Sequence, residues 1–153
     1  MNSPIGVLKL TSDDYHLKSI SFDAEISGEP AEFTEVLSLA QKQLEEYFSG
    51  TRRQFDLPLD PDGTDFQQKV WKQLSEVPYG STMSYIEIAR GLNAESSSRA
   101  VGMANGRNPI PVIIPCHRII GHNGKLTGYA GGLERKKWLL LHEQQNSENN
   151  QLF

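Results

Sequence analysis

The chain has 153 residues, of which 37% are hydrophobic, and a formal net charge of -4. This length allows one or two small cores, and no apolar run approaches the roughly 20 residues that a membrane-spanning helix needs. A single cysteine excludes an internal disulfide and a cysteine-rich zinc site, and residues 1–4 open no signal peptide, so we expect a cytoplasmic protein without metal or cofactor.

The first part of the chain, residues 1–59, predicts a small α/β domain. Gly6–Thr11 and Leu17–Phe22 alternate in part between apolar and polar residues, with turn residues between them, so we expect a β-hairpin. From Ala31 to Ser49, apolar residues recur at helical spacing and predict an amphipathic helix. We expect one more short strand at Phe55–Leu59. No residue in this part resembles a catalytic group.

A change in composition predicts a linker at residues 60–63, which read Asp-Pro-Asp-Gly and are all turn formers. Residues 1–62 carry 5 Lys and Arg against 12 Asp and Glu, whereas residues 63–153 carry 10 against 7. The second part, with an excess of three positive charges, is therefore the part expected to meet phosphate. Ordinary solvated charge would give the same excess, so this inference is weak by itself.

The second domain is expected to span residues 64–145 and to begin with three helices. Capping-box patterns at Thr64 and Ser84 each predict the start of a helix. A third helix is expected to be capped by Ser96–Ser98 and to stop at Asn105–Gly106. The second and third helices are short and close in sequence, which is typical of a helix-turn-helix.

The third helix carries small side chains at Ala100, Gly102 and Ala104. Small side chains let a helix backbone approach DNA closely but provide little base reading. We therefore expect DNA binding through phosphate and shape rather than sequence. The same composition also suits close packing against a neighbouring helix, and this alternative stays open.

The only cysteine of the chain, Cys116, lies in the run Ile113–Ile120 and directly precedes His117. A thiol needs a base or a nearby positive charge to become a reactive thiolate. Neighbouring side chains on a strand point to opposite faces, so adjacency alone is weak. Pro115 favours an extended approach with a turn at the cysteine, which would present the thiol at a strand end. A buried structural cysteine is the alternative.

The chain is expected to end in a helix and a tail. Leu133–Glu143 predicts the final helix, on which Lys136 and Glu143 are seven residues apart and therefore share a face. Residues 146–153 are polar and are expected to form a frayed tail.

Three ordered motifs resemble the O6-alkylguanine-DNA alkyltransferases, also called methylated-DNA-protein-cysteine methyltransferases. They are Asn108–Ile120 around Pro-Cys-His-Arg, Gly128–Leu133 and Trp138–Glu143, and the resemblance covers about residues 66–143. It implies a ribonuclease-H-like α/β domain followed by a winged-helix-like helix-turn-helix domain. It also implies a monomeric transferase that acts once, moving an alkyl group irreversibly from O6 of guanine, or O4 of thymine, in double-stranded DNA to Cys116.

The resemblance further implies a catalytic role for five residues. Glu143 would orient His117, and His117 would take the proton of Cys116 through a water. Tyr85 would donate toward the guanine ring as the base departs. Asn108 would hold the cysteine segment to the helix-turn-helix.

DNA and substrate contacts are implied in the same way. Arg99 would fill the place of a base flipped out of the duplex, and Ala130 stands where some relatives have serine. The expected DNA contacts are Ser84, Tyr85, Arg99, Ala100, Gly102 and Ala104. The expected substrate pocket comprises Pro111, Ile119, Tyr129, Ala130, Gly131, Gly132 and Lys136, with backbone groups of Cys116 and Ile119 reading the edge of the base.

Two other functions remain open. A lesion-binding protein would recognise alkylguanine without repairing it, although alkyltransferase-like proteins of that kind lack the acceptor cysteine. A Cys-His hydrolase would use Cys116, His117 and Glu143 on a carbonyl substrate. Arg118 is expected to be an ion-pair partner rather than a catalyst, and His142 a structural residue.

Overall fold

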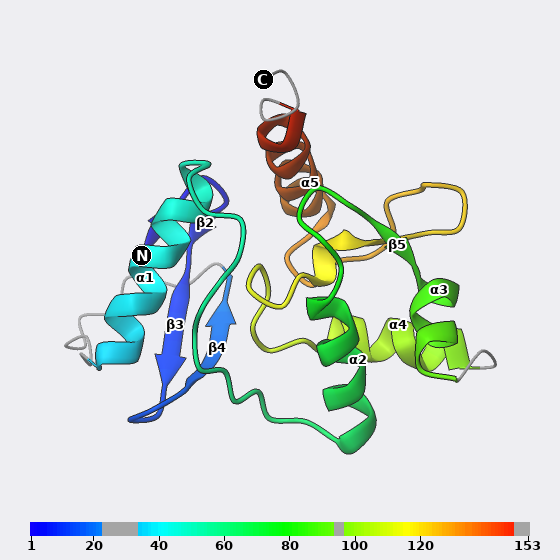
Figure 1. The fold of residues 1–153 in the computed structure, drawn as a ribbon, viewed down its shortest axis with the longest axis horizontal. Coiled ribbons are helices and arrows are strands. Elements are labelled where there is room, and N and C mark those ends of the chain that lie inside the picture. Colours follow the sequence, from blue (N-terminus) through cyan, green and yellow to red (C-terminus); the bar gives the residue numbers. More distant parts are fainter. Residues whose placement is uncertain (23–33, 94–96, 149–153) are drawn as a thin grey trace. The chain divides into compact units, whose positions relative to one another are not determined.

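The computed structural model describes residues 1–22, 34–93 and 97–148, and the chain divides into two compact units, Met1–Asp62 and Gly63–Phe153 (Figure 1). The boundary falls within the segment predicted to be a linker, residues 60–63. Lys18 pairs with Asp60 at 2.9 Å and with Asp62 at 3.0 Å, so most of that segment is fastened to the first unit.

The strands of the first unit form two antiparallel pairs. Strand β1 (Asn2–Ser3) pairs with β2 (Gly6–Val7), and β3 (Lys9–Ser12) pairs with β4 (Leu17–Ser21). The predicted hairpin is therefore confirmed in β3 and β4. Its first arm is shorter than predicted, because Gly6 and Val7 belong to the separate pair with β1.

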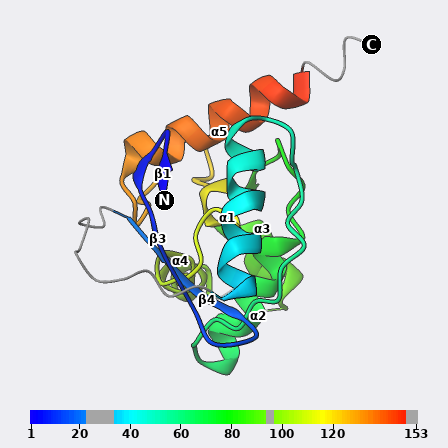
Figure 2. The same ribbon diagram turned by 90° about the vertical axis from the view of Figure 1, so that its left-hand side faces the viewer.

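Helix α1 (Glu35–Phe48) packs on β3 and β4, as the view in Figure 2 shows. Thr34 caps it by accepting a hydrogen bond from the backbone N–H of Leu37 at 3.1 Å. Its buried side chains follow the helical spacing of the sequence: Val36, Ala40, Gln43, Leu44 and Tyr47. The predicted helix is thus confirmed from Glu35, while residues 31–33 lie outside the described part of the chain.

The strand predicted at Phe55–Leu59 is wrong, because an isolated bridge between Leu59 and Leu17 is the only strand pairing that this segment makes with the described residues. The side-chain amide of Gln43 accepts a hydrogen bond from the N–H of Asp56 at 2.9 Å and donates one to its carbonyl at 3.0 Å. These two bonds replace those that a neighbouring strand would make. Pro58 has no N–H to donate to a ladder, and only its carbonyl accepts a bond, from Leu17.

Three helices open the second unit: α2 (Asp65–Ser75), α3 (Tyr85–Gly91) and α4 (Ser98–Gly106). Both predicted capping boxes are present, at Thr64 and Ser84, and both helices begin where expected. Of the three serines predicted to cap α4, Ser96 lies outside the described residues, whereas Ser97 and Ser98 are described. Ser97 occupies the N-cap position but makes no side-chain cap, because its backbone is not in the extended conformation that a cap requires.

The remainder of the second unit surrounds the cysteine. A 3-10 turn, η2 (Cys116–Arg118), leads into β6 (Ile119–Ile120), which pairs in parallel with β5 (Met83–Ser84). Helix α5 (Leu133–Glu148) contacts η2, and so does α2. The strand thus follows the cysteine, whereas the sequence predicts one that leads up to it.

Helix α5 extends past its predicted end at Glu143 to Glu148, so residues 146–148 are helical rather than part of a frayed tail. Asn146 supports this last turn by donating to the carbonyl of His142 at 2.7 Å. Throughout residues 1–22, 34–93 and 97–148, no helix is long and apolar enough to cross a membrane. The same described residues contain no cluster of three His, Cys, Asp or Glu side chains suited to holding a metal ion.

Candidate active site

The cysteine sits in a tightly turned and almost fully buried segment. Pro115 has φ -82° and ψ 63°, and the N–H of Cys116 donates to the carbonyl of Ile114 at 2.8 Å, which together define an inverse γ-turn. Residues 111–114 form turns and a bend rather than a strand, so the extended approach predicted from Pro115 is wrong, whereas the turn predicted at Cys116 is present. Upstream of the turn, Val112 has φ 73°, a left-handed conformation that a β-branched residue rarely adopts.

The surroundings of Cys116 hold it in the thiol form. Its exposed fraction is only 4%, and this burial raises the pKa of the thiol to about 11. The polar side chain of Asn108 and the positive charge of Lys136 oppose the increase in the pKa without cancelling it. At neutral pH roughly one molecule in ten thousand would carry a thiolate, so transfer chemistry at this sulfur needs a base.

Two asparagines fasten the cysteine segment to the end of α4. Asn108 donates to the carbonyl of Ile114 at 2.8 Å and accepts from the N–H of Ile110 at 3.0 Å. Asn105 donates to the carbonyl of Cys116 at 3.4 Å. The bracing predicted for Asn108 is seen directly, whereas sequence reasoning missed Asn105. Its only signal was a polar residue beside Ala104 on the buried face of a helix.

His117 and Glu143 meet in the interior. Nε2 of His117 lies 2.7 Å from a carboxylate oxygen of Glu143, and both side chains are at most 1% exposed. Arg118 grips the same carboxylate with two nitrogens, at 2.8 and 3.0 Å, and donates to the carbonyl of Val77 at 2.7 Å. Gly80, with φ 79°, adds its backbone N–H at 3.2 Å. The expected ion-pair role of Arg118 is confirmed.

The protonation states of this pair follow from their surroundings. Burial alone would favour a protonated Glu143, but the hydrogen bonds from His117 and Arg118 and the positive charge of Arg118 lower its pKa well below the usual range. Burial lowers the pKa of His117, so the imidazole is neutral at neutral pH. Because an ionised carboxylate only accepts, Nε2 of His117 carries the proton that it donates to Glu143.

This assignment leaves a free lone pair on Nδ1 of His117. Nδ1 is buried and has no hydrogen-bond partner among the residues that the structure describes. A buried nitrogen with a lone pair and no partner is suited to accept a proton from a water or a thiol. The two ring nitrogens therefore differ in role: Nε2 holds the ring against Glu143, and Nδ1 is suited to accept a proton.

A buried lysine ties the last helix to the loop that follows β6. Lys136 lies on the same buried face of α5 as Leu139 and Glu143, which confirms the face predicted from their spacing. Its Nζ donates to the backbone carbonyl of Thr127 at 3.1 Å. Burial lowers the pKa of Lys136, and the positive charge that it retains favours the thiolate form of Cys116.

An open groove of about 540 Å³ lies between α3 and α4 and is lined in part by Tyr85, Arg99 and Gly102. Two apolar side chains of this groove are exposed, Met103 by 56% and Ile86 by 39%. Ser84 also lines it, and Ala100 lies half-buried nearby on α4.

Ala104, by contrast, is not on the groove side of α4. It is 2% exposed, and its carbonyl accepts a hydrogen bond from Nε1 of Trp71 at 2.9 Å. Its prediction as a DNA contact is therefore wrong. The spacing Val101, Ala104, Asn105 places it on the face packed against α2, where a small residue permits close approach.

The residues expected to form the substrate pocket are distributed around the cysteine turn and the loop before α5. Ile119 and Pro111 are buried, as is Gly131, whose carbonyl accepts from Arg135 at 2.9 Å. Ala130 and Gly132 are exposed, and Tyr129 is half-buried next to the thiol. The backbone carbonyl of Cys116 was expected to contact the edge of the base. It already accepts hydrogen bonds from the N–H of Ile119 and from the side chain of Asn105.

Comparison with known proteins places both units in one family. The ribonuclease-like domain of 6-O-methylguanine DNA methyltransferase matches residues 1–61, and the DNA-binding domain of the same protein matches residues 65–145. A methylated-DNA–protein-cysteine methyltransferase of Methanosarcina acetivorans is 49% identical over 143 residues, which cover 90% of this chain and 92% of the relative.

Solved structures give the same result. The crystal structure of Mycobacterium tuberculosis OGT in complex with DNA is 47% identical, with a TM-score of 0.87, and the match covers 95% of this chain and 91% of that one. The O6-methylguanine-DNA methyltransferase of Pyrococcus kodakaraensis is 26% identical, with a TM-score of 0.54 and 88% coverage of each chain. The expected order, a ribonuclease-like unit and then a DNA-binding unit, is confirmed. The chain belongs to the 6-O-methylguanine DNA methyltransferase family.

Proposed function

We propose that this protein repairs DNA by direct reversal, transferring a methyl or other alkyl group from O6 of guanine to the sulfur of Cys116. One observation carries the proposal at the level of chemistry. A buried thiol whose pKa is raised to about 11 directly precedes a neutral histidine whose Nε2 is anchored to Glu143 and whose Nδ1 has no partner in the described part of the chain. This is a base and its orienting group, and the base is the next residue in the chain after a nucleophile that needs both.

The transfer balances without a cofactor. The thiol proton passes to Nδ1 of His117 through a water, and the sulfur then forms a bond to the alkyl carbon as the bond from that carbon to O6 breaks. The electron pair of the broken bond stays on the base, and Tyr85 donates a proton to a ring nitrogen, so that neutral guanine leaves. The proton held by His117 restores the Tyr85 hydroxyl through solvent. Thiol and alkylguanine thus become thioether and guanine.

Sulfur is the appropriate atom for this target, because a soft and polarisable thiolate displaces well at a saturated carbon. The product is a thioether, and no other group at the site offers a way to cleave it. Each molecule therefore acts once, and the amount of lesion removed equals the amount of protein consumed.

The groove between α3 and α4 is the proposed DNA contact, with Arg99 exposed at the start of α4. An alkylated base inside a duplex is shielded by stacking, so it must be turned out before the sulfur can reach it. Arg99 then occupies the vacated place in the stack.

The protein acts on the duplex as a monomer. O4-alkylthymine, which has the same alkyl–oxygen bond, is a second substrate.

Intact mass spectrometry tests this proposal. Protein incubated with duplex DNA that contains O6-methylguanine is expected to gain the mass of one methyl group, with one lesion lost for each protein molecule. Cys116→Ala, which retains the neighbouring histidine, is expected to gain nothing. The absence of an adduct in folded, reduced protein would contradict the proposal.

The rival functions give different results in the same experiment. Tight binding to the lesion without a mass gain would indicate a lesion-binding protein. Repeated turnover of an ester or amide, with rate dependent on Cys116, would indicate a hydrolase. A stable adduct of one methyl group excludes both as the main activity.

A further inference from the structure

The hydroxyl of Tyr85 is held by a residue that is distant in sequence. Tyr85 begins α3, and its oxygen lies 2.6 Å from Oγ1 of Thr127, 42 residues further along the chain. The ring itself lies against α4, because a Cβ atom added at Gly102 would be 3.7 Å from two of its carbons. The helix thus positions the ring, and Thr127 positions the hydroxyl.

Thr127 is itself held on two sides. Its carbonyl accepts from Nζ of Lys136, the buried lysine of α5, at 3.1 Å. Its methyl group lies close to Gly121, where an added Cβ atom would be 3.1 Å from Cγ2. Gly121 in turn donates to the carbonyl of Lys125 at 2.9 Å and closes the base of the loop. These contacts restrict the side chain of Thr127 and direct its hydroxyl at Tyr85.

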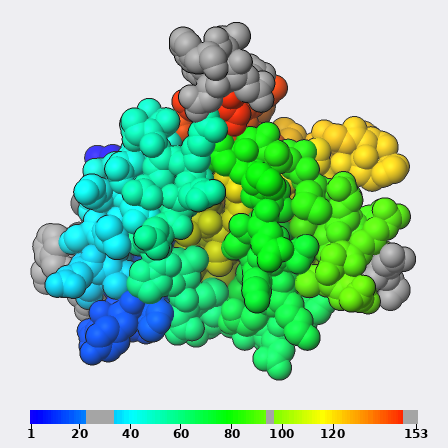
Figure 3. Space-filling view, viewed as in Figure 1, coloured from blue at the N-terminus to red at the C-terminus, as the bar shows by residue number. Residues whose placement is uncertain are grey.

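The loop that carries Thr127 is otherwise open to solvent. Residues 122–126 are all exposed, and Figures 1 and 3 show this segment, in gold, standing out from the second unit. Thr127 is half-buried at the base of the loop, where the chain returns toward α5. The hydrogen bond between the two hydroxyls is partly shielded from water, which strengthens it. It also involves Tyr85, which lines the groove between α3 and α4.

From these contacts we infer that Thr127 positions Tyr85 for proton donation and stabilises the charge that develops on its oxygen. The inference rests on the proposed function, in which Tyr85 protonates the departing guanine. As that proton moves, the Tyr85 oxygen becomes partly negative, and the Thr127 hydroxyl donates to it. Because Thr127 is the donor in this pair, the single proton of Tyr85 is directed at the base before the transfer begins.

A double-mutant cycle separates this positioning role from a structural one. The four proteins are the wild type, Thr127→Val, Tyr85→Phe and the double variant. Each is mixed in excess with duplex DNA containing O6-methylguanine, and the first-order rate constant of methyl transfer is measured at saturation. Affinity for the same duplex is measured with each protein in its Cys116→Ala form, in which transfer cannot occur.

Thr127→Val keeps the shape of the side chain and removes only the hydroxyl. Its transfer rate constant is expected to fall about 10- to 100-fold, the range for loss of one hydrogen bond to a charged group, while DNA affinity stays within about twofold. In the Tyr85→Phe background, the same substitution is expected to have no further effect on rate. Equal losses in both backgrounds would overturn the inference, because Thr127 would then not act through Tyr85.

Conservative variants serve as matched controls. Thr127→Ser keeps the hydroxyl, and its rate is expected to stay within about threefold of the wild type. If Thr127→Ser loses as much rate as Thr127→Val, the methyl group rather than the hydroxyl is responsible and the inference is wrong. Should the valine variant not fold, Thr127→Ala removes the same hydroxyl without adding bulk and must give the same loss.

Failure of this inference is distinguishable from failure of the proposed function. If wild-type protein gains no methyl group, the proposed function itself is wrong. If the wild type gains the methyl group and Thr127→Val transfers it equally fast, only the role of Thr127 is wrong.

Discussion

The carboxylate of Glu143 is shared by His117, which reaches it with Nε2 at 2.7 Å, and by Arg118, which grips it with two nitrogens. One buried anion therefore both orients the proposed base and neutralises a buried cation. Removing a partner from such a pair leaves an uncompensated charge in the interior. Stability and chemistry are thus coupled at this residue, and the coupling can be measured.

Arg118→Met is expected to destabilise the protein strongly. The substitution leaves the Glu143 carboxylate without its bidentate partner and the carbonyl of Val77 without a donor. We expect a loss of about 3–5 kcal/mol in the free energy of unfolding, measured by urea titration. Arg107→Met is the control, because Arg107 is exposed, and it should change stability by no more than about 0.5 kcal/mol. Similar small effects for both variants would show that the buried pair contributes little.

Stability is expected to fall in two stages as the pH is lowered. Burial lowers the pKa of His117 below 6.5, so below that pH the unfolded chain binds a proton that the folded protein does not. The folded-state pKa of Glu143 is lowered from 4.5, so its contribution is present above 4.5 and is lost as the pH falls toward the folded value.

Urea unfolding at a series of pH values from 7 to 3 measures both stages. His117→Gln cannot titrate in this range, and it is expected to flatten the first stage while leaving the second. A wild-type stability that does not change between pH 7 and pH 5 would contradict the assignment of a neutral, buried imidazole.

Asn108→Ala is expected to affect both stability and the reactivity of the thiol. The variant leaves the buried N–H of Ile110 without its acceptor, which should cost about 1–3 kcal/mol, and the carbonyl of Ile114 keeps only its bond from the N–H of Cys116. It also removes a group that lowers the pKa of Cys116, so the pH profile of thiol alkylation by iodoacetamide should shift upward. Asn123→Ala, in an exposed turn, is the control. An unshifted alkylation profile would contradict the second effect.

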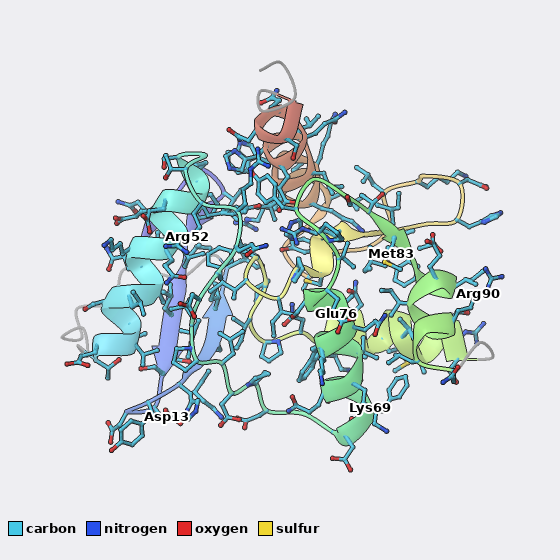
Figure 4. The ribbon with its side chains drawn as sticks, in the orientation of Figure 1. Asp13, Arg52, Lys69, Glu76, Met83 and Arg90 are labelled. Atoms are coloured by element: carbon cyan, nitrogen blue, oxygen red, sulfur yellow. The ribbon has the colours of Figure 1, made fainter. Side chains whose placement is uncertain are left out.

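Arg99→Ala is expected to impair repair of duplex DNA far more than reaction with a free guanine derivative. Only the duplex requires a base to be turned out of the stack, and only there would the arginine fill a vacated place. The two rates are compared by following the methyl or benzyl gain in mass. Lys69→Ala, on α2 in Figure 4, removes a positive charge outside the groove and should spare both reactions. If Arg99→Ala slows both reactions equally, the stack-filling role is wrong.

Local signals in the sequence predicted the helix starts correctly. Thr64 and Ser84 each form a capping box with a residue three positions later, and this contact is complete within one turn. The amphipathic spacing of α1 was equally readable, because a helix buries the side chains that recur on one face. The strand wrongly predicted at Phe55–Leu59 shows the limit of such local signals. There the side chain of Gln43, 13 residues away from Asp56 in sequence, pairs with the Asp56 backbone instead of a neighbouring strand.

By itself the sequence determined the helices, the two-part organisation, and the family resemblance that singled out Cys116, His117 and Glu143. Only the tertiary structure decided which atoms meet: Nε2 rather than Nδ1 of His117 on Glu143, the double grip of Arg118, and the contact of Tyr85 with Thr127. Hydrogen-bond partners separated by 25 to 42 residues depend on the packing of whole segments. Because any carboxylate or hydroxyl satisfies the same donor, residue type alone does not specify the partner.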